Sequence, residues 1–123
     1  MIDRTLRDCR ILVVEDEYLL ADELQTDLAD AAAIVIGPLG TLDQAFELIK
    51  AGGKIDGAIL DVNLCGELVY PAADLLLERA VPFVFATGYD DSVIPSRFAG
   101  VARCPKPVNI RQITQALGRD ADK

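Results

Sequence analysis

The sequence of 123 residues contains no histidine, and this absence removes several kinds of chemistry. Ser-His-Asp and Cys-His catalysis are excluded, as is any zinc site that needs an imidazole ligand. Any phosphohistidine chemistry would have to receive its histidine from another protein.

Basic residues and long apolar runs are also scarce. The chain has 12 Lys and Arg against 20 Asp and Glu, a net charge of −8, which argues against binding to nucleic-acid phosphates. The longest apolar runs, such as AAAIVI and VPFVFA, are far too short to span a bilayer, and the N-terminal MIDRTLRDCR lacks the apolar core of an export signal. We therefore expect a soluble, cytoplasmic protein without nucleic-acid or membrane partners.

The cysteines do not indicate a disulfide framework. Cys9, Cys65 and Cys104 are odd in number and show no CxxC spacing, which is typical of reduced thiols in the cytosol. All three are predicted to be small apolar fillers of the core.

Short apolar runs alternate with helical patterns along the chain. The runs read as five nearly continuous apolar strands, which predicts a parallel sheet buried on both faces: 11–14, 34–36, 57–60, 82–86 and 101–104. Four amphipathic helices are expected around residues 20–31, 42–49, 71–80 and 110–117. Thr41 with Gln44 and Asn109 with Gln112 form capping-box patterns, and Gly118 should end the last helix. Pro95 leaves room only for a short or irregular helix after the fourth strand.

Five βα units in a chain of this length predict an α/β fold. The expected architecture is a flavodoxin-like (βα)5 doubly wound parallel sheet of strand order 2-1-3-4-5, forming a single domain over residues 1–123. In such a sheet the ligand site lies at the carboxyl ends of the strands.

Polar residues follow four of these strand ends. Glu15 and Asp16 follow the first strand, Asp61 the third, Thr87 the fourth and Lys106 the fifth. In the predicted order the first and third strands are neighbours, so three carboxylates meet and call for a hard divalent cation such as Mg²⁺. A hydroxyl and a lysine beside them suit a phosphoryl group.

Each of these residues also has an ordinary structural explanation. The acidic residues at 15–17 could serve as helix N-caps, Thr87 could belong to a simple turn, and Lys106 could be a solvated surface charge. Asp61 is the hardest to explain in this way, because it ends a buried central strand where an unpaired carboxylate is costly. Together the four strand ends indicate a phosphoryl site.

Four segments at these positions resemble the signatures of response-regulator receiver domains: VVEDE at 13–17, ILDVNL at 59–64, FATGY at 85–89 and CPKPV at 104–108. The resemblance covers essentially the whole chain. It implies the flavodoxin-like fold and a phosphoacceptor aspartate supplied by a histidine kinase or a histidine phosphotransfer protein.

Carried over residue by residue, the resemblance assigns the metal site first. Asp61 corresponds to the phosphoacceptor and a ligand of Mg²⁺, Asp16 to a direct ligand and Glu15 to a ligand acting through water. Asn63 occupies the position whose backbone carbonyl binds the metal.

The resemblance also assigns the phosphoryl-binding residues. Thr87 corresponds to the switch hydroxyl, and Lys106 to the lysine that pairs with Asp61 and the phosphoryl group; the Lys106-Pro107 peptide is expected to be cis. Pro105 is compatible with the fifth strand only if that strand lies at the sheet edge.

The string PFVFATGYDD at 82–91 resembles a bacterial receiver subgroup named for its FATGUY signature, several members of which act in general stress signalling. The chain departs from most receivers at Arg103, where the family usually has the aromatic residue that swings inward on activation. We therefore hypothesise that activation rearranges residues 88–100 instead, with Tyr89 as a switch or water-access residue. A packing aromatic is the alternative for Tyr89.

These features predict a single-domain response regulator, a phosphorylated protein that signals through protein contacts in a two-component system. It would not be an enzyme beyond catalysing its own phosphotransfer and dephosphorylation. A phosphate sink or relay for a kinase is the alternative within this class. A Mg²⁺-dependent aspartyl phosphohydrolase is less well supported, because Asn63 stands where such enzymes usually carry an acid/base aspartate. A receiver-like protein that binds constitutively is disfavoured by the complete set of site residues.

Overall fold

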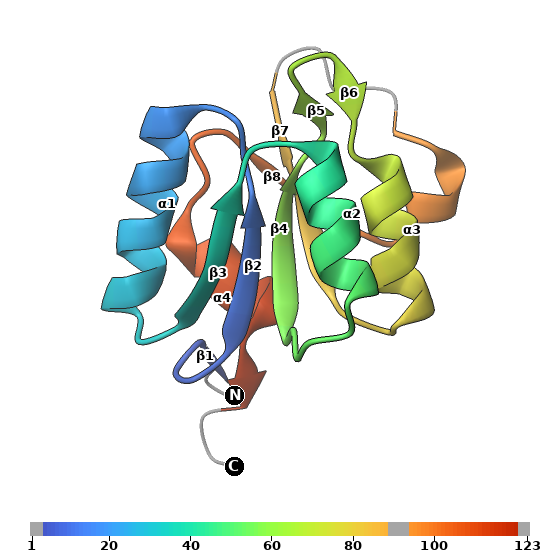
Figure 1. The fold of residues 1–123 in the computed structure, drawn as a ribbon. Helices are drawn as coiled ribbons and strands as arrows, with labels where there is room; N and C mark the ends of the chain where they lie inside the picture. Colours follow the sequence, from blue (N-terminus) through green and yellow to red (C-terminus); the bar gives the residue numbers. More distant parts are fainter. Residues whose placement is uncertain (1–3, 89–93, 121–123) are drawn as a thin grey trace.

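A computed structural model describes residues 4–88 and 94–120. Tyr89 lies outside the described residues. Figure 1 shows a central sheet with helices on both of its faces. The principal strands are β2 (Arg10–Val14), β3 (Ile34–Leu39), β4 (Gly57–Asp61), β7 (Phe83–Thr87) and β8 (Ala102–Pro105). The helices are α1 (Tyr18–Asp30), α2 (Leu42–Lys50), α3 (Tyr70–Glu78) and α4 (Ile110–Leu117), with a short 3₁₀ helix, η1, at Ser96–Phe98.

The five principal strands form a parallel sheet in the order β3-β2-β4-β7-β8. This is the predicted order 2-1-3-4-5, so the flavodoxin-like fold is confirmed. Strand β3 lies on one side of β2, and β4 lies on the other side. This reversal of direction places the switch point of the fold between β2 and β4.

Burial of the strands depends on their position in the sheet. Every residue of β4 is buried, as are Ile11–Val14 of β2 and Phe83–Ala86 of β7. The prediction that all five strands are buried on both faces is wrong for β3, in which no residue is buried, and for β8, in which only Cys104 is buried. Both are edge strands, so each has a neighbour on one side only, and the position of β8 accommodates Pro105 as predicted.

Two hydrophobic cores lie on the two faces of the sheet. On one face α2 and α3 contribute Ala45, Ile49 and Leu76. On the other, α1 and α4 contribute Leu24, Leu28, Ile113 and Leu117. Within each helix these side chains recur at helical spacing, so each helix presents one apolar face to the sheet.

The predicted helix ends are correct in part. Thr41 caps α2 by accepting a hydrogen bond from the Gln44 backbone N–H, but the Gln44 side chain accepts from Gly40 rather than from Thr41. Asn109 caps α4 by accepting from the Arg111 backbone N–H rather than from that of Gln112. Gly118 ends α4 in an extended conformation.

The segment after β7 has the short helix expected from Pro95. In its described part, Ile94 and Phe98 are buried, and the Phe98 ring lies 5.4 Å from that of Phe85. Arg97 forms an ion pair with Asp74 of α3 at 2.9 Å. Together these contacts hold η1 against β7 and α3.

Two short antiparallel pairs were not predicted. β1 (Arg4–Thr5) pairs with β9 (Arg119–Asp120), and β5 (Asn63–Leu64) pairs with β6 (Glu67–Leu68). Strands of two residues have no periodicity to detect, so a sequence pattern cannot reveal them.

The β5–β6 hairpin turns at Cys65 and Gly66, whose φ angles are 51° and 92°. Two successive positive φ angles are the mark of a tight hairpin turn, in which glycine is favoured. This hairpin projects directly beyond the end of β4.

Candidate phosphoryl and metal site

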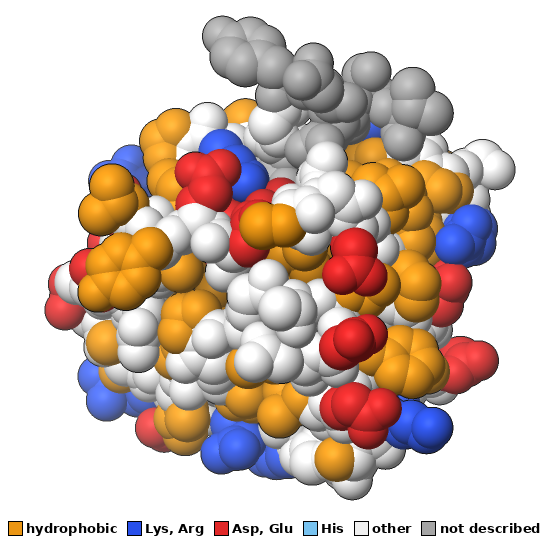
Figure 2. Space-filling model, turned by 45° about the horizontal axis from the view of Figure 1, so that its top comes forward, with side chains coloured by type: hydrophobic (Ala, Val, Ile, Leu, Met, Phe, Trp, Pro, Cys, Tyr) orange, Lys and Arg blue, Asp and Glu red, His pale blue; other side chains and the backbone are white. Residues whose placement is uncertain are grey.

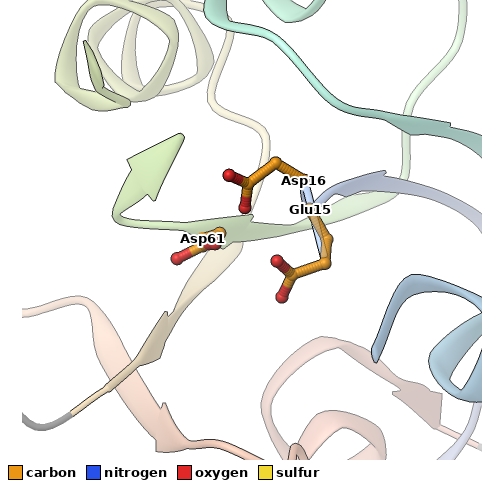
Figure 3. A group of neighbouring side chains, drawn as sticks. All are labelled: Glu15, Asp16 and Asp61. Atoms are coloured by element: carbon orange, nitrogen blue, oxygen red, sulfur yellow. The ribbon is translucent and has the colours of Figure 1, made fainter. Parts of the chain in front are cut away.

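Three carboxylates converge at the carboxyl ends of β2 and β4. Glu15 and Asp16 follow β2 and Asp61 ends β4; because Val14 and Leu60 are partners in the parallel register, these residues emerge side by side. One oxygen from each of the three lies within 4.8 Å of the others, and Figure 3 shows the carboxylates gathered around one point. Glu15 and Asp61 are buried, with only 7% and 2% of their surface exposed.

Lys106 supplies a positive charge to this cluster. Its Nζ lies 2.9 Å from Asp61 Oδ2, 3.4 Å from Glu15 Oε1 and 3.8 Å from Glu17 Oε1. The Lys106 backbone N–H donates to the carbonyl of Thr87 at 3.0 Å, and this bond holds the Lys106 backbone against the end of β7. The Lys106-Pro107 peptide is cis, the predicted isomer, and so is Gly37-Pro38.

The electrostatics of the site reflect its burial. Burial together with the neighbouring Glu15 raises the pKa of Asp61 from 3.8 to about 7, although Lys106 opposes the shift. Burial acts to lower the pKa of Lys106, but the hydrogen bond and the charge of Asp61 outweigh burial and raise it. Burial and the Glu15 carboxylate therefore favour the protonated form of Asp61, whereas the Lys106 ammonium favours its ionised form.

The Asp16 carboxylate has a partner that the sequence analysis missed. The Cys65 thiol donates to Asp16 Oδ2 at 2.9 Å. Burial acts to raise the pKa of Asp16, but hydrogen bonds, chiefly from Cys65, outweigh burial and lower it. The same hydrogen bond and the Asp16 charge raise the pKa of the Cys65 thiol.

The prediction that all three cysteines fill the core is therefore wrong for Cys65. It is exposed, whereas Cys9 and Cys104 are buried as predicted, and all three thiols are free. Only its position in a hairpin turn, four residues after Asp61, could have hinted at this placement.

The remaining predicted residues lie at the same edge of the sheet. Thr87 is the last residue of β7 and follows Ala86, the partner of Asp61 in the sheet. The Asn63 backbone N–H donates to Asp61 Oδ1 at 3.3 Å, and the Asn63 side chain accepts from the Gly66 N–H at 2.7 Å within the hairpin. The structure thus brings together Glu15, Asp16, Asp61 and Lys106, with Asn63 and Thr87 at their border.

The residues present fit a magnesium ion. Their donor atoms are carboxylate oxygens, which hard divalent cations prefer, and two of the three carboxylates are too buried to be stabilised by water alone. Glu15, Asp16 and Asp61 would hold the ion.

The surface around the cluster is partly hydrophobic. In Figure 2, where the carboxyl-end edge of the sheet faces the viewer, acidic and basic side chains lie side by side next to hydrophobic ones. Tyr18 and Leu19, at the start of α1, are 81% and 79% exposed. In the described part of the chain, no helix is long and apolar enough to cross a membrane.

Proteins similar to this chain are found among solved structures. No protein-family model and no curated protein matches the chain. Among solved structures, SdrG from Sphingomonas melonis Fr1 is 40% identical, with a TM-score of 0.78 over 89% of this chain and 93% of that one. The BeF3-activated conformation of SdrG, from Pseudomonas melonis Fr1, is also 40% identical, with a TM-score of 0.71 over 88% and 92% of the two chains.

A more distant match is a structure of Saccharomyces cerevisiae proteins. It contains the histidine phosphotransfer protein Ypd1 and the receiver domain of its downstream response regulator Ssk1. Identity is 18% and the TM-score is 0.73, over 93% of this chain and 89% of that one. At this identity the match shows a shared fold.

Proposed function

Because this chain belongs to the response-regulator receiver family, we propose that Asp61 accepts a phosphoryl group from the phosphohistidine of a partner protein and that phosphorylation controls contacts with other proteins. The observation that carries the proposal is the buried Asp61 carboxylate, held 2.9 Å from Lys106 at the junction of β2 and β4. A carboxylate with these surroundings has little structural purpose, since an apolar residue would fill the same position at lower cost.

The chemistry requires only a nucleophile and charge stabilisation. An oxygen of Asp61 forms a bond to phosphorus while the bond from phosphorus to the partner's imidazole nitrogen breaks, and the imidazole keeps the electron pair. No general base is needed when the attacking group is the ionised form of Asp61, which predominates above its pKa of about 7 and which a bound cation would favour further. Lys106 and the Thr87 hydroxyl supply a cation and a donor for the phosphoryl oxygens.

A bound Mg²⁺ would supply further stabilisation of the negative charge that gathers on the transferring oxygens. Glu15 is proposed to bind the metal through water, and the backbone carbonyl of Asn63 completes the proposed ligand set. The chain is proposed to catalyse only its own phosphorylation and dephosphorylation, because hydrolysis of the aspartyl phosphate returns Asp61 to its starting state.

The donor is proposed to be a histidine kinase or a histidine phosphotransfer protein. The chain has no histidine of its own, and the exposed Tyr18 and Leu19 beside the site offer an apolar surface to such a protein. The PFVFATGYDD string further supports membership of the FATGUY subgroup and a role in general stress signalling.

Phosphotransfer from an autophosphorylated histidine kinase in Mg²⁺ tests the proposal. The wild-type protein should acquire an acid-stable, base-labile label, and Asp61→Asn should not. Asp30→Asn makes the same change at an exposed position at the end of α1 and should be labelled normally. Labelling of Asp61→Asn at the wild-type level would exclude Asp61 as the acceptor.

A direct regulator and a phosphate sink differ in their output. A regulator should capture a partner protein more strongly in the presence of beryllofluoride, a mimic of the aspartyl phosphate, whereas a sink should only drain phosphate from a kinase. The phosphohydrolase alternative predicts turnover of small phosphate esters. Because the Asn63 side chain binds the Gly66 backbone and has no acidic proton, we expect no such turnover.

A further inference from the structure

The β5–β6 hairpin, at the top of Figure 1, contacts two of the three carboxylates of the proposed metal site. Near its base, the Asn63 backbone N–H donates to Asp61 Oδ1 at 3.3 Å. At its turn, the Cys65 thiol donates to Asp16 Oδ2 at 2.9 Å. The hairpin therefore reaches from the end of β4 to the residues that follow β2.

The base of this hairpin is anchored in the hydrophobic core. Leu64 and Val69 are buried, and the Val69 backbone N–H donates to the Val62 carbonyl at 2.9 Å. A hairpin held in this way carries the side chain at its turn on a fixed backbone. Cys65 therefore approaches Asp16 from a defined direction.

The backbone conformation at the turn is unusual for a cysteine. The φ angle of Cys65 is 51°, in the left-handed region that favours glycine, asparagine and aspartate. The Asn63 side chain braces the turn by accepting from the Gly66 N–H at 2.7 Å. Because cysteine has no conformational advantage at this position, its contribution to the structure comes from its side chain, which contacts Asp16.

The Asp16 carboxylate needs such a donor because it lies among like charges. One oxygen from each of Glu15, Asp16 and Asp61 lies within 4.8 Å of the others. Lys106 pairs with Glu15 and Asp61, but within residues 4–88 and 94–120 no ion pair joins it to Asp16. A carboxylate that rotates freely turns away from two like charges and toward water. The hydrogen bond from Cys65 opposes this rotation.

We propose that Cys65 is a positioning residue of the metal site, whose thiol holds the Asp16 carboxylate in the orientation that binds Mg²⁺ and fastens the β5–β6 hairpin beside it. Because the hairpin also carries the proposed carbonyl ligand of Asn63, this one contact positions two ligands. The proposal rests on the proposed function for its effect on phosphotransfer, whereas its effect on metal binding is measured separately.

The size of the effect follows from the strength of the contact. Hydrogen-bond partners of metal ligands change metal affinity because they fix the orientation of the ligand. A thiol is a weak donor, and Cys65 is exposed, so its removal should weaken Mg²⁺ binding roughly threefold to tenfold, at or below the lower end of such effects.

Magnesium affinities of wild type and three variants test this role by titration calorimetry at pH 8. Cys65→Ala removes the donor and should show the full loss. Cys65→Ser keeps a hydroxyl donor at nearly the same place and should recover most of the affinity. Leu68→Ala shortens an exposed side chain of the same hairpin and should change the affinity by less than about twofold.

A second measurement follows the contact without metal. In EDTA, three-bond NMR couplings give the side-chain rotamer populations of Asp16. We expect one dominant rotamer in the wild type, in Cys65→Ser and in Leu68→Ala, and rotamer averaging in Cys65→Ala. A hairpin residue that only stabilised the fold would leave these couplings unchanged when replaced.

Phosphotransfer distinguishes positioning of the metal ligand from a part in the reaction itself. The donor is phosphoramidate, which has the P–N bond of a phosphohistidine. In Cys65→Ala the Mg²⁺ concentration that gives the half-maximal rate should rise by the factor by which the affinity falls. The rate at saturating Mg²⁺ should stay within about twofold of wild type.

Several results would overturn the proposal: no Mg²⁺ binding by the wild type, equal affinities of the wild type and Cys65→Ala, or a Cys65→Ser protein that binds as weakly as Cys65→Ala. Tighter binding by Cys65→Ala would also overturn it, because the thiol would then compete with the metal for Asp16. If the wild type binds Mg²⁺ but accepts no phosphoryl group, the proposed function fails while calorimetry still decides the role of Cys65.

Discussion

Lys106 and Asp61 form a buried ion pair, with Nζ 2.9 Å from Oδ2, and the lysine also lies 3.4 Å from Glu15 Oε1. A single cation thus lies beside two buried carboxylates, which stand at the carboxyl ends of the neighbouring strands β2 and β4. Its side chain is 16% exposed, against 6% and 3% for the side chains of Glu15 and Asp61. The lysine therefore lies at the mouth of the site, between the carboxylates and solvent.

Replacing this lysine should destabilise the metal-free protein in a pH-dependent way. In Lys106→Met, Glu15 and Asp61 lose their shared cation, so the free energy of unfolding should fall by roughly 1–3 kcal/mol at pH 8. The loss should be smaller at pH 5, where Asp61 takes up a proton. Urea denaturation measures both values, and Lys54→Met removes an exposed lysine as the control. An equal loss for the two variants at pH 8 would contradict the role assigned to Lys106.

The raised pKa of Asp61 makes metal-free stability depend on pH. Because this pKa is raised from 3.8 to about 7, the folded chain binds a proton at Asp61 more tightly than the unfolded chain does. The contribution of Asp61 to the free energy of unfolding therefore falls as the pH rises through this interval, by at most about 4 kcal/mol. Asp61→Asn removes that contribution and should be more stable than wild type at pH 8 in EDTA, as measured by urea denaturation. Asp30→Asn should behave like wild type; an Asp61→Asn protein less stable than wild type would refute the argument.

Magnesium binding should show the complementary pH dependence. Protons and the metal compete for Asp61, so apparent Mg²⁺ affinity should be about tenfold weaker at pH 6 than at pH 8, given a pKa of about 7. Titration calorimetry at the two pH values measures the ratio and the protons released. In Asp61→Asn, any remaining affinity should vary much less over this range. A wild-type affinity that is constant between pH 6 and pH 8 would show that Asp61 does not contribute to the metal site.

The Cys65 thiol should report the charge of Asp16. The hydrogen bond to Asp16 raises the pKa of this thiol, and alkylation requires the thiolate. Asp16→Asn should therefore speed the reaction of Cys65 with iodoacetamide at pH 8 roughly severalfold, measured by mass spectrometry of the labelled peptide. Asp74→Asn is the control, because it removes a carboxylate of α3 that pairs with Arg97 rather than with Cys65. Cys9 and Cys104 are buried and should react slowly in both proteins.

The junction of α4 and β9 should be intolerant of a side chain at Gly118. A Cβ there would lie 2.4 Å from the Thr114 carbonyl oxygen and 3.0 Å from that of Thr5, both backbone atoms with little room to move. Gly118→Ala should lower the free energy of unfolding by roughly 1–3 kcal/mol. Gly53→Ala meets no atom within 4 Å and should have a small effect. Urea denaturation of the two variants compares them, and equal stabilities would show that the close approach is relieved at little cost.

Some residues of this site can be predicted from the sequence, whereas others cannot. Asp61 could be predicted because a carboxylate that ends a continuous apolar strand violates the burial pattern. Lys106 could be predicted because prolines flank it at the end of the last strand. Cys65 could not, because its contact with Asp16 joins residues 49 positions apart and depends on a two-residue hairpin with no periodic signal.

By itself, the amino-acid sequence determined the fold class, the strand order and the identity of the carboxylates, because these follow from local periodicity and from the handedness of βα connections. It also showed that these 123 residues contain no histidine. Only the tertiary structure decided which strands are covered, how one lysine serves two carboxylates, and that the Cys65 thiol contacts Asp16. These relationships depend on the packing of side chains from distant segments, where distances of a few ångströms decide the interaction and sequence spacing carries no information about them.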